Sequence, residues 1–253
     1  PHKLALTGNH MPLTTDTFAQ DGADLSRREH LRQLFWTAAS FGAAPWLAPS
    51  AAQARGQRNP FSHFGPVQGP DAHGLCLPAS FTARVVAVSG ERPVPGMPYV
   101  WHTFPAGGAT FATRDGGWVY ANNSEVASGR GGVGALRFDA RGRVVQAYPI
   151  LTGTTLNCAG GPTPWGTWLS AEEFPQGQVW ECQPLGRPED AGVRPALGCF
   201  KHEAVTVDPV RKMLYLTEDE PDGRLYRFVC APRDWPTGAR RPALKDGTLQ
   251  VLQ

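Results

Sequence analysis

The sequence predicts an all-β fold, and more narrowly a β-propeller. From residue 79 onward, short apolar stretches alternate with glycine-containing turns, and no helical periodicity holds over a full window. The 29 Gly and 24 Pro residues favour many short strands and tight turns over long helices. Aromatic strands that end in an acidic residue recur about every 45 residues, and so do the second strands that follow them. This spacing is the size of a four-stranded propeller blade.

The expected strands follow one another along the chain. They are Ala83–Ser89, Trp118–Asn122, Gly142–Ile150, Thr167–Ala171, Ala204–Asp208 and Lys212–Thr217. Acidic residues close three aromatic strands at Glu125, Glu173 and Asp219, with steps of 48 and 46 residues. Second strands follow and end at Phe138, Cys182 and Phe228, with steps of 44 and 46 residues. One repeated structural unit explains both series, whereas coincidence between three segments is the alternative.

Residues 79–253 form the predicted propeller domain. At about 45 residues a blade, this length corresponds to an incomplete ring of about four blades. Propellers usually need more blades to close, and an open ring leaves an unpaired strand edge. We therefore expect the sequence to be part of a longer chain.

Residues 1–54 are expected to be an N-terminal extension with an export signal. Arg27 and Arg28 form a twin-arginine pair, followed by the apolar stretch Leu34–Ala48 and the small-residue site Ala52–Ala54. This order is typical of a signal peptide, and the apolar stretch is shorter than the roughly 20 residues that span a bilayer. An amphipathic helix with an accidental arginine pair is the alternative.

The export signal predicts recognition by the twin-arginine (Tat) export machinery and a periplasmic or secreted location. No other stretch is long and apolar enough to predict a stable membrane span. Residues 55–78 are rich in glycine and proline and are expected to be an irregular linker.

Charge and motif content argue against several classes of function. The formal net charge is +2, from 24 basic and 22 acidic residues, which argues against a broad nucleic-acid surface. The sequence contains no serine-hydrolase elbow, P-loop or dinucleotide-binding glycine motif. Its five cysteines form no C-x-x-C pair, so a zinc ribbon is not expected, and any disulfide pairing stays open.

Acidic residues recur at strand ends that would face the central channel of a propeller. Carboxylates that converge there repel one another unless cations lie between them, so hard metal ions are expected. This interpretation is favoured for Glu172, Glu173 and Glu203. Ordinary solvent-facing turn acids are the alternative, which is favoured for Glu220 and Asp222.

The segment Leu156–Glu173 concentrates glycines, prolines and tryptophans around Cys158. A thiolate at this position could bind iron or zinc, whereas a buried structural cysteine is the alternative. His202 precedes Glu203, and this pair indicates either a metal site or a histidine used only in packing.

Five motifs in order resemble those of the PhoX-like alkaline phosphatase family. They are Trp118–Glu125, Gly131–Val133, Asn157–Glu173, Gly198–Ala204 and Tyr215–Asp219. The resemblance implies an exported phosphomonoesterase on a six-bladed propeller that acts on a small-molecule phosphate ester. It also implies calcium and iron in the channel, which activate an oxygen nucleophile. By motif position, Cys158 and Glu203 would be iron ligands, Glu172 and Glu173 further metal ligands, and Glu125 and Asp219 additional candidates.

Two departures from the family pattern bear on activity. Ala171 stands where phosphatase members often have cysteine, and later blades that supply further ligands lie outside this sequence. The first hypothesis is a metal-dependent phosphomonoesterase, or an N-terminal fragment of one with an incomplete active site. The alternatives are a non-catalytic exported propeller that binds a partner or ligand, and a fragment without activity of its own.

Overall fold

The computed structural model describes residues 64–252, so Arg27, Arg28 and the predicted signal peptide over 1–54 lie outside the described residues. Strands dominate the described part, together with the short 3-10 helices η2 (Pro188–Asp190) and η3 (Pro195–Leu197). Among residues 64–252, no helix has the length and apolar character needed to cross a bilayer.

A two-stranded sheet lies at the start of the described residues. It consists of β1 (Val67–Pro70) and β2 (Cys76–Pro78). The Asp71 carboxylate closes the connecting turn, because it accepts the backbone N–H groups of His73 at 2.8 Å and Leu75 at 2.9 Å. This sheet falls within residues 55–78, where an irregular linker was expected.

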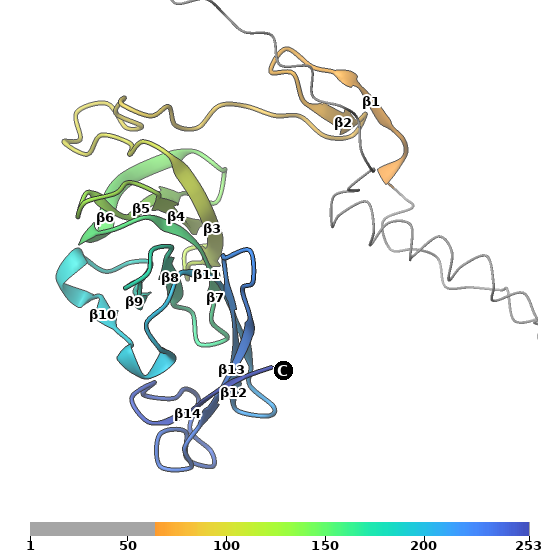
Figure 1. The fold of residues 1–253 in the computed structure, drawn as a ribbon. Helices are drawn as coiled ribbons and strands as arrows, with labels where there is room; N and C mark the ends of the chain where they lie inside the picture. The colour runs from red at the N-terminus through yellow and green to blue at the C-terminus, as the bar shows by residue number, and fades with distance from the viewer. Residues whose placement is uncertain (1–63, 253) are drawn as a thin grey trace, which may run out of the picture. The chain divides into compact units, whose positions relative to one another are not determined.

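The larger compact unit comprises Gly69–Cys76 and the residues from Phe81 onward, and it contains three four-stranded sheets (Figure 1). In each sheet the strands lie side by side in chain order, and neighbouring strands are antiparallel. The first sheet comprises β3 (Pro105–Ala112), β4 (Trp118–Ser124), β5 (Gly131–Phe138) and β6 (Val144–Thr154). The second comprises β7 (Asn157–Pro162), β8 (Trp168–Glu172), β9 (Val179–Cys182) and β10 (Gly192–Val193). The third comprises β11 (His202–Asp208), β12 (Met213–Glu218), β13 (Leu225–Cys230) and β14 (Gly247–Val251).

These sheets are the blades of an incomplete propeller, as the sequence repeat predicts. The strands that end at the repeated acids are β4, β8 and β12, each the second strand of its blade. The second series of strands in the sequence, marked by Phe138, Cys182 and Phe228, corresponds to the third strand of each blade, β5, β9 and β13. The described residues thus hold three complete blades between Pro105 and Val251, in addition to the β1–β2 sheet.

The predicted strand Ala83–Ser89 is wrong, because no residue of this segment pairs in a sheet. Val86 and Ala87 pack instead against a core cluster that contains Trp101 and Phe138. Val85 and Val88 remain exposed. The apolar residues of this segment therefore cover the first blade without joining its ladder of hydrogen bonds.

Hydrophobic cores lie between neighbouring blades. One core joins the first two blades through residues such as Val119, Ile150 and Trp168. Another joins the second and third blades through residues such as Leu169 and Phe228. Burial of these apolar faces drives the blades to pack against one another.

Glycines allow the first strands of adjacent blades to approach closely. A Cβ atom at Gly107 of β3 would lie 2.7 Å from the Cα of Ala159 in β7. A Cβ atom at Gly161 of β7 would lie 1.8 Å from the carbonyl oxygen of Val205 in β11. Strands β3, β7 and β11 therefore run close together, and residues at their ends can share one site.

Candidate metal centre

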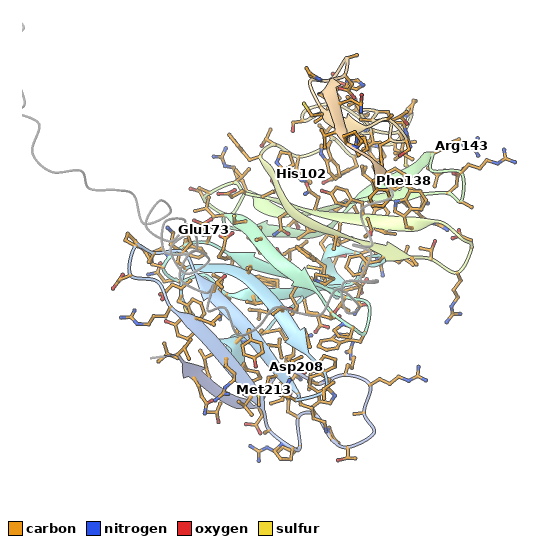
Figure 2. The ribbon with its side chains drawn as sticks, turned by 90° about the vertical axis from the view of Figure 1, so that its right-hand side faces the viewer. His102, Phe138, Arg143, Glu173, Asp208 and Met213 are labelled. Carbon is orange, nitrogen blue, oxygen red and sulfur yellow. The ribbon has the colours of Figure 1, made fainter. Side chains whose placement is uncertain are left out.

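Five of the six predicted ligands come together at one end of the first strands. Cys158 lies on β7 and Glu203 on β11, whereas Glu125, Glu173 and Asp219 directly follow β4, β8 and β12. This end is opposite the turn that joins Asp208 to Met213, as Figure 2 shows for Glu173.

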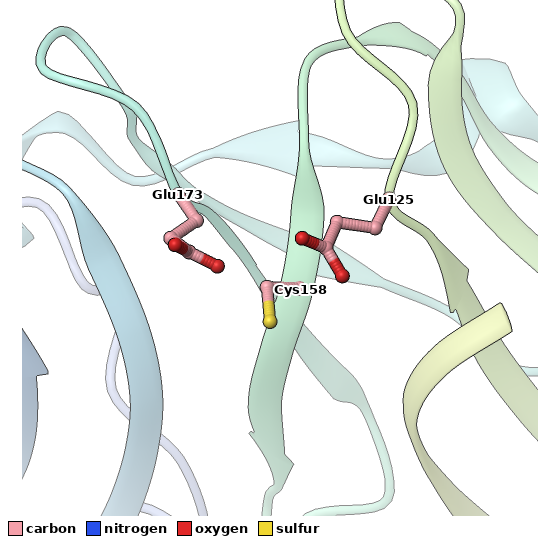
Figure 3. A group of neighbouring side chains, drawn as sticks. All are labelled: Glu125, Cys158 and Glu173. Carbon is pink, nitrogen blue, oxygen red and sulfur yellow. The ribbon is translucent and has the colours of Figure 1, made fainter. Parts of the chain in front are cut away.

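The five residues form two overlapping triads. The first triad contains Glu125, Cys158 and Glu173, whose ligand atoms all lie within 4.8 Å of one another (Figure 3). The second contains Glu173, Glu203 and Asp219 and meets the same limit. The first triad offers a thiol and two carboxylates, whereas the second offers carboxylates only.

One backbone hydrogen bond, repeated in every blade, holds the acid that follows the second strand. Its N–H donates to the carbonyl oxygen of the residue that directly precedes the first strand. The bonds join Glu125 to Phe104 (2.9 Å), Glu173 to Leu156 (2.8 Å) and Asp219 to Lys201 (3.1 Å). The repeated fold therefore places three acidic side chains in equivalent positions.

Glu172 does not join the cluster, although the sequence predicts it as a ligand. Its side chain is only 6% exposed, and Oε1 accepts the backbone N–H of Thr155 at 2.8 Å. Oε2 accepts the N–H groups of Gln178 at 3.2 Å and of the Trp180 indole at 3.1 Å. Consecutive residues of an extended chain face opposite sides, so Glu172 turns into the blade where Glu173 turns toward the shared site.

Glu218 repeats this arrangement in the third blade. Its Oε2 accepts the hydroxyl of Tyr226 at 3.1 Å and the backbone N–H of Arg224 at 3.2 Å. The aromatic donor stands eight residues after the carboxylate, as Trp180 does relative to Glu172. The first acid of each adjacent pair thus stabilises its own blade.

Burial and crowded carboxylates raise the pKa of the Cys158 thiol well above its ordinary range. Its Sγ donates to Oε1 of Glu203 at 3.8 Å, and the charges of Glu125 and Glu173 act in the same direction. The pKa of Glu173 is also raised, first by burial and then by the proximity of Asp219 and Glu203. Without a cation, Cys158 and Glu173 therefore hold their protons more tightly than isolated side chains do.

Lys201 supplies a positive charge at the cluster that sequence analysis missed. Its Nζ lies 3.6 Å from Oε1 of Glu173 and 3.8 Å from Oδ2 of Asp219. Lys201 directly precedes the His202–Glu203 pair, but this position alone does not show that its side chain reaches an acid of the preceding blade.

His202 is a packing residue, which was one of the two interpretations of the His202–Glu203 pair. It is fully buried, and its ring centroid lies 3.7 Å from that of Phe200. Its Nε2 lies 3.3 Å from the carbonyl oxygen of Gly198, and burial lowers its pKa to about 4. Only Glu203 of this pair reaches the cluster.

Asn123 fixes the backbone that carries Cys158, and sequence analysis missed this role. Its Nδ2 donates to the carbonyl oxygens of Cys158 at 3.1 Å and Ala159 at 2.7 Å. Its Oδ1 accepts the indole N–H of Trp168 at 2.8 Å and the hydroxyl of Ser170 at 2.9 Å. Asn123 thereby ties the first blade to the strand that presents the thiol.

The chemistry of the donor set fits the cations that the resemblance implies. Carboxylates suit hard cations such as calcium, and a thiolate suits a softer metal such as iron. The two triads contain four carboxylates, and the ammonium of Lys201 lies against two of them. Acidic groups therefore outnumber basic groups at the site, and a cation would offset the excess negative charge.

Two comparisons with known proteins found matches. The profile of a family described as "Alkaline phosphatase PhoX" matches residues 100–179 and 174–253. Among solved structures, one similar chain is Pseudomonas fluorescens PhoX in complex with vanadate, a transition state analogue. It shows 19% sequence identity and a TM-score of 0.45, and the match covers 58% of the present chain and 45% of that chain. No curated protein matched. Because the two profile matches together extend over more than half of the sequence, the chain belongs to the PhoX alkaline phosphatase family.

Proposed function

We propose that this chain provides the calcium- and iron-binding part of a phosphomonoesterase. The convergence of four carboxylates and one thiol from three blades carries this proposal. Membership of an alkaline phosphatase family supports a phosphate ester as substrate. A twin-arginine pair at Arg27 and Arg28 supports export by the Tat machinery to the periplasm or the exterior.

The two triads suggest two kinds of cation. Glu125, Cys158 and Glu173 would hold iron, and Glu173, Glu203 and Asp219 would hold calcium. Motif position implies iron for Glu203, and we assign it to calcium instead, because its carboxylate groups with two other carboxylates. When bound, these cations would offset phosphate charge and activate the oxygen nucleophile. Cys158 would release its proton on binding iron, since the thiolate is the ligand form of cysteine.

Elemental analysis and a phosphatase assay test the proposal together. Protein produced with calcium and iron should contain both metals. An enzyme that joins this part to the further blades of the family propeller should also hydrolyse p-nitrophenyl phosphate, and chelation should abolish that hydrolysis. Cys158→Ser should lose iron and Glu203→Gln should lose metal, whereas Glu189→Gln, at an exposed position in η2, should leave both properties unchanged. A folded, metal-free and inactive protein would instead support the ligand-binding propeller.

A further inference from the structure

Lys201 occupies a position that is apolar in the other two blades. The residue directly before the first strand is Phe104 in the first blade, Leu156 in the second and Lys201 in the third. In each blade its carbonyl oxygen accepts the N–H of the acid after the second strand. The backbone role is therefore shared, and the charged side chain is specific to the third blade.

The Lys201 ammonium lies against the all-carboxylate triad. Its distances to Glu173 and Asp219 fall within ion-pair range but exceed the usual length of a direct hydrogen bond. The Lys201 side chain is 28% exposed, so the charge is partly shielded from water, and the Asp219 side chain is 59% exposed. Lys201 is thus near enough to influence a cation there without being locked in place.

We propose that Lys201 determines cation affinity at this triad, because its ammonium competes with the cation for Glu173 and Asp219. This inference rests on the proposed function, in which Glu173, Glu203 and Asp219 hold calcium. Without calcium, Lys201 reduces repulsion among the carboxylates and stabilises the metal-free blades. With calcium bound, the same charge repels the cation and weakens its binding.

Calcium titration of Lys201 variants tests this competition. Protein is stripped with a chelator and titrated with calcium alone in a calorimeter. Lys201→Met should bind calcium about tenfold more tightly, since even a screened unit charge near a divalent cation has an effect of that order. Lys201→Arg keeps the charge and should stay within about twofold of the unchanged protein.

Lys245→Met is the matched control for the loss of one positive charge. Lys245 is exposed and lies in the connection between β13 and β14, at the end of β13 opposite Asp219. The calcium affinity of Lys245→Met should differ from that of the unchanged protein by less than about twofold. Thermal unfolding gives a second measurement. Without calcium, Lys201→Met should have a lower melting temperature than the unchanged protein. On calcium addition, its melting temperature should rise by more than that of the unchanged protein.

The possible results separate this inference from the proposed function. If the unchanged protein binds calcium and Lys201→Met binds equally or more weakly, the competition is refuted while the metal centre stands. If Lys245→Met shows the same gain, the effect reflects net charge and the inference fails. If no variant binds calcium, both the inference and the proposed calcium site fail.

Discussion

Replacing Glu172 and Glu173 one at a time should separate folding from cation binding. Glu172→Ala leaves three donors without their acceptor: the backbone N–H groups of Thr155 and Gln178 and the indole of Trp180. A hydrogen bond to a charged group contributes about 1.5–3 kcal/mol, and water that enters the cavity recovers part of the loss. We expect a loss of about 3–5 kcal/mol, a large share of the roughly 5–15 kcal/mol that stabilises a typical domain.

Glu173→Ala should have the opposite profile. The Glu173 carboxylate is repelled by neighbouring acids and forms a long ion pair with Lys201. Its removal relieves repulsion and loses that pair, so the free energy of unfolding should change by about 1 kcal/mol or less. Both triads lose a shared ligand, so binding of calcium and iron should fall sharply.

Urea unfolding of metal-free protein, followed by tryptophan fluorescence, measures the first effect, and elemental analysis of metal-loaded protein measures the second. Glu189→Ala is the control, since this exposed residue of η2 belongs to neither triad. The reasoning would be refuted if Glu172→Ala unfolded at the unchanged urea concentration and lost its metals. It would also be refuted if Glu173→Ala kept both metals.

Three further predictions concern packing and protonation. Gly161→Ala should lower the free energy of unfolding by about 3 kcal/mol, because the added Cβ would meet the Val205 carbonyl oxygen and force β7 away from β11. An unchanged urea midpoint would contradict this. In metal-free protein at neutral pH, iodoacetamide should alkylate Cys158 more slowly than the exposed Cys199, because the pKa of the Cys158 thiol is raised. Peptide mass spectrometry measures both rates, and equal rates would argue against the raised pKa. The raised pKa of Glu173 means that the folded state binds its proton more tightly, so its contribution to metal-free stability should fall as pH rises from about 4.5 through that raised pKa. The lowered pKa of His202 acts in the opposite direction over this range, so the measurement is the difference between two urea midpoints. Relative to Glu173→Gln, the unchanged protein should lose stability as pH rises, and parallel pH profiles would count against the assignment.

Sequence spacing could predict the blades because each repeats the same strand and turn. The acids at Glu125, Glu173 and Asp219 are found in this way, since each follows the second strand of its blade. The prediction from an apolar stretch failed at Ala83–Ser89, whose residues suit either a strand or an irregular segment packed on a core. Short apolar stretches alone do not distinguish these outcomes.

The contributions of Lys201 and Asn123 depend on contacts between blades, so the local sequence could not reveal them. Lys201 contacts Glu173 of the preceding blade, and Asn123 bonds the backbone of Cys158 in the next. Both residues resemble ordinary polar residues at strand ends. Their roles follow from the close approach of the first strands, which the glycines of β3 and β7 permit.

The division of roles within each strand-end pair follows from the extended backbone. Alternation sends one residue of a pair into the blade and the other toward the shared end of the first strands. Glu172 and Glu218 accept donors within their blades, whereas Glu173 and Asp219 join the cluster. The first blade obeys the same rule with a different residue. There Ser124 donates to the carbonyl oxygen of Thr103 at 3.0 Å, and its neighbour Glu125 faces the cluster. The inward residue therefore forms hydrogen bonds within its blade, as a neutral donor in the first blade and as a charged acceptor in the other two. Only the second position is acidic in all three described blades, and it supplies the site.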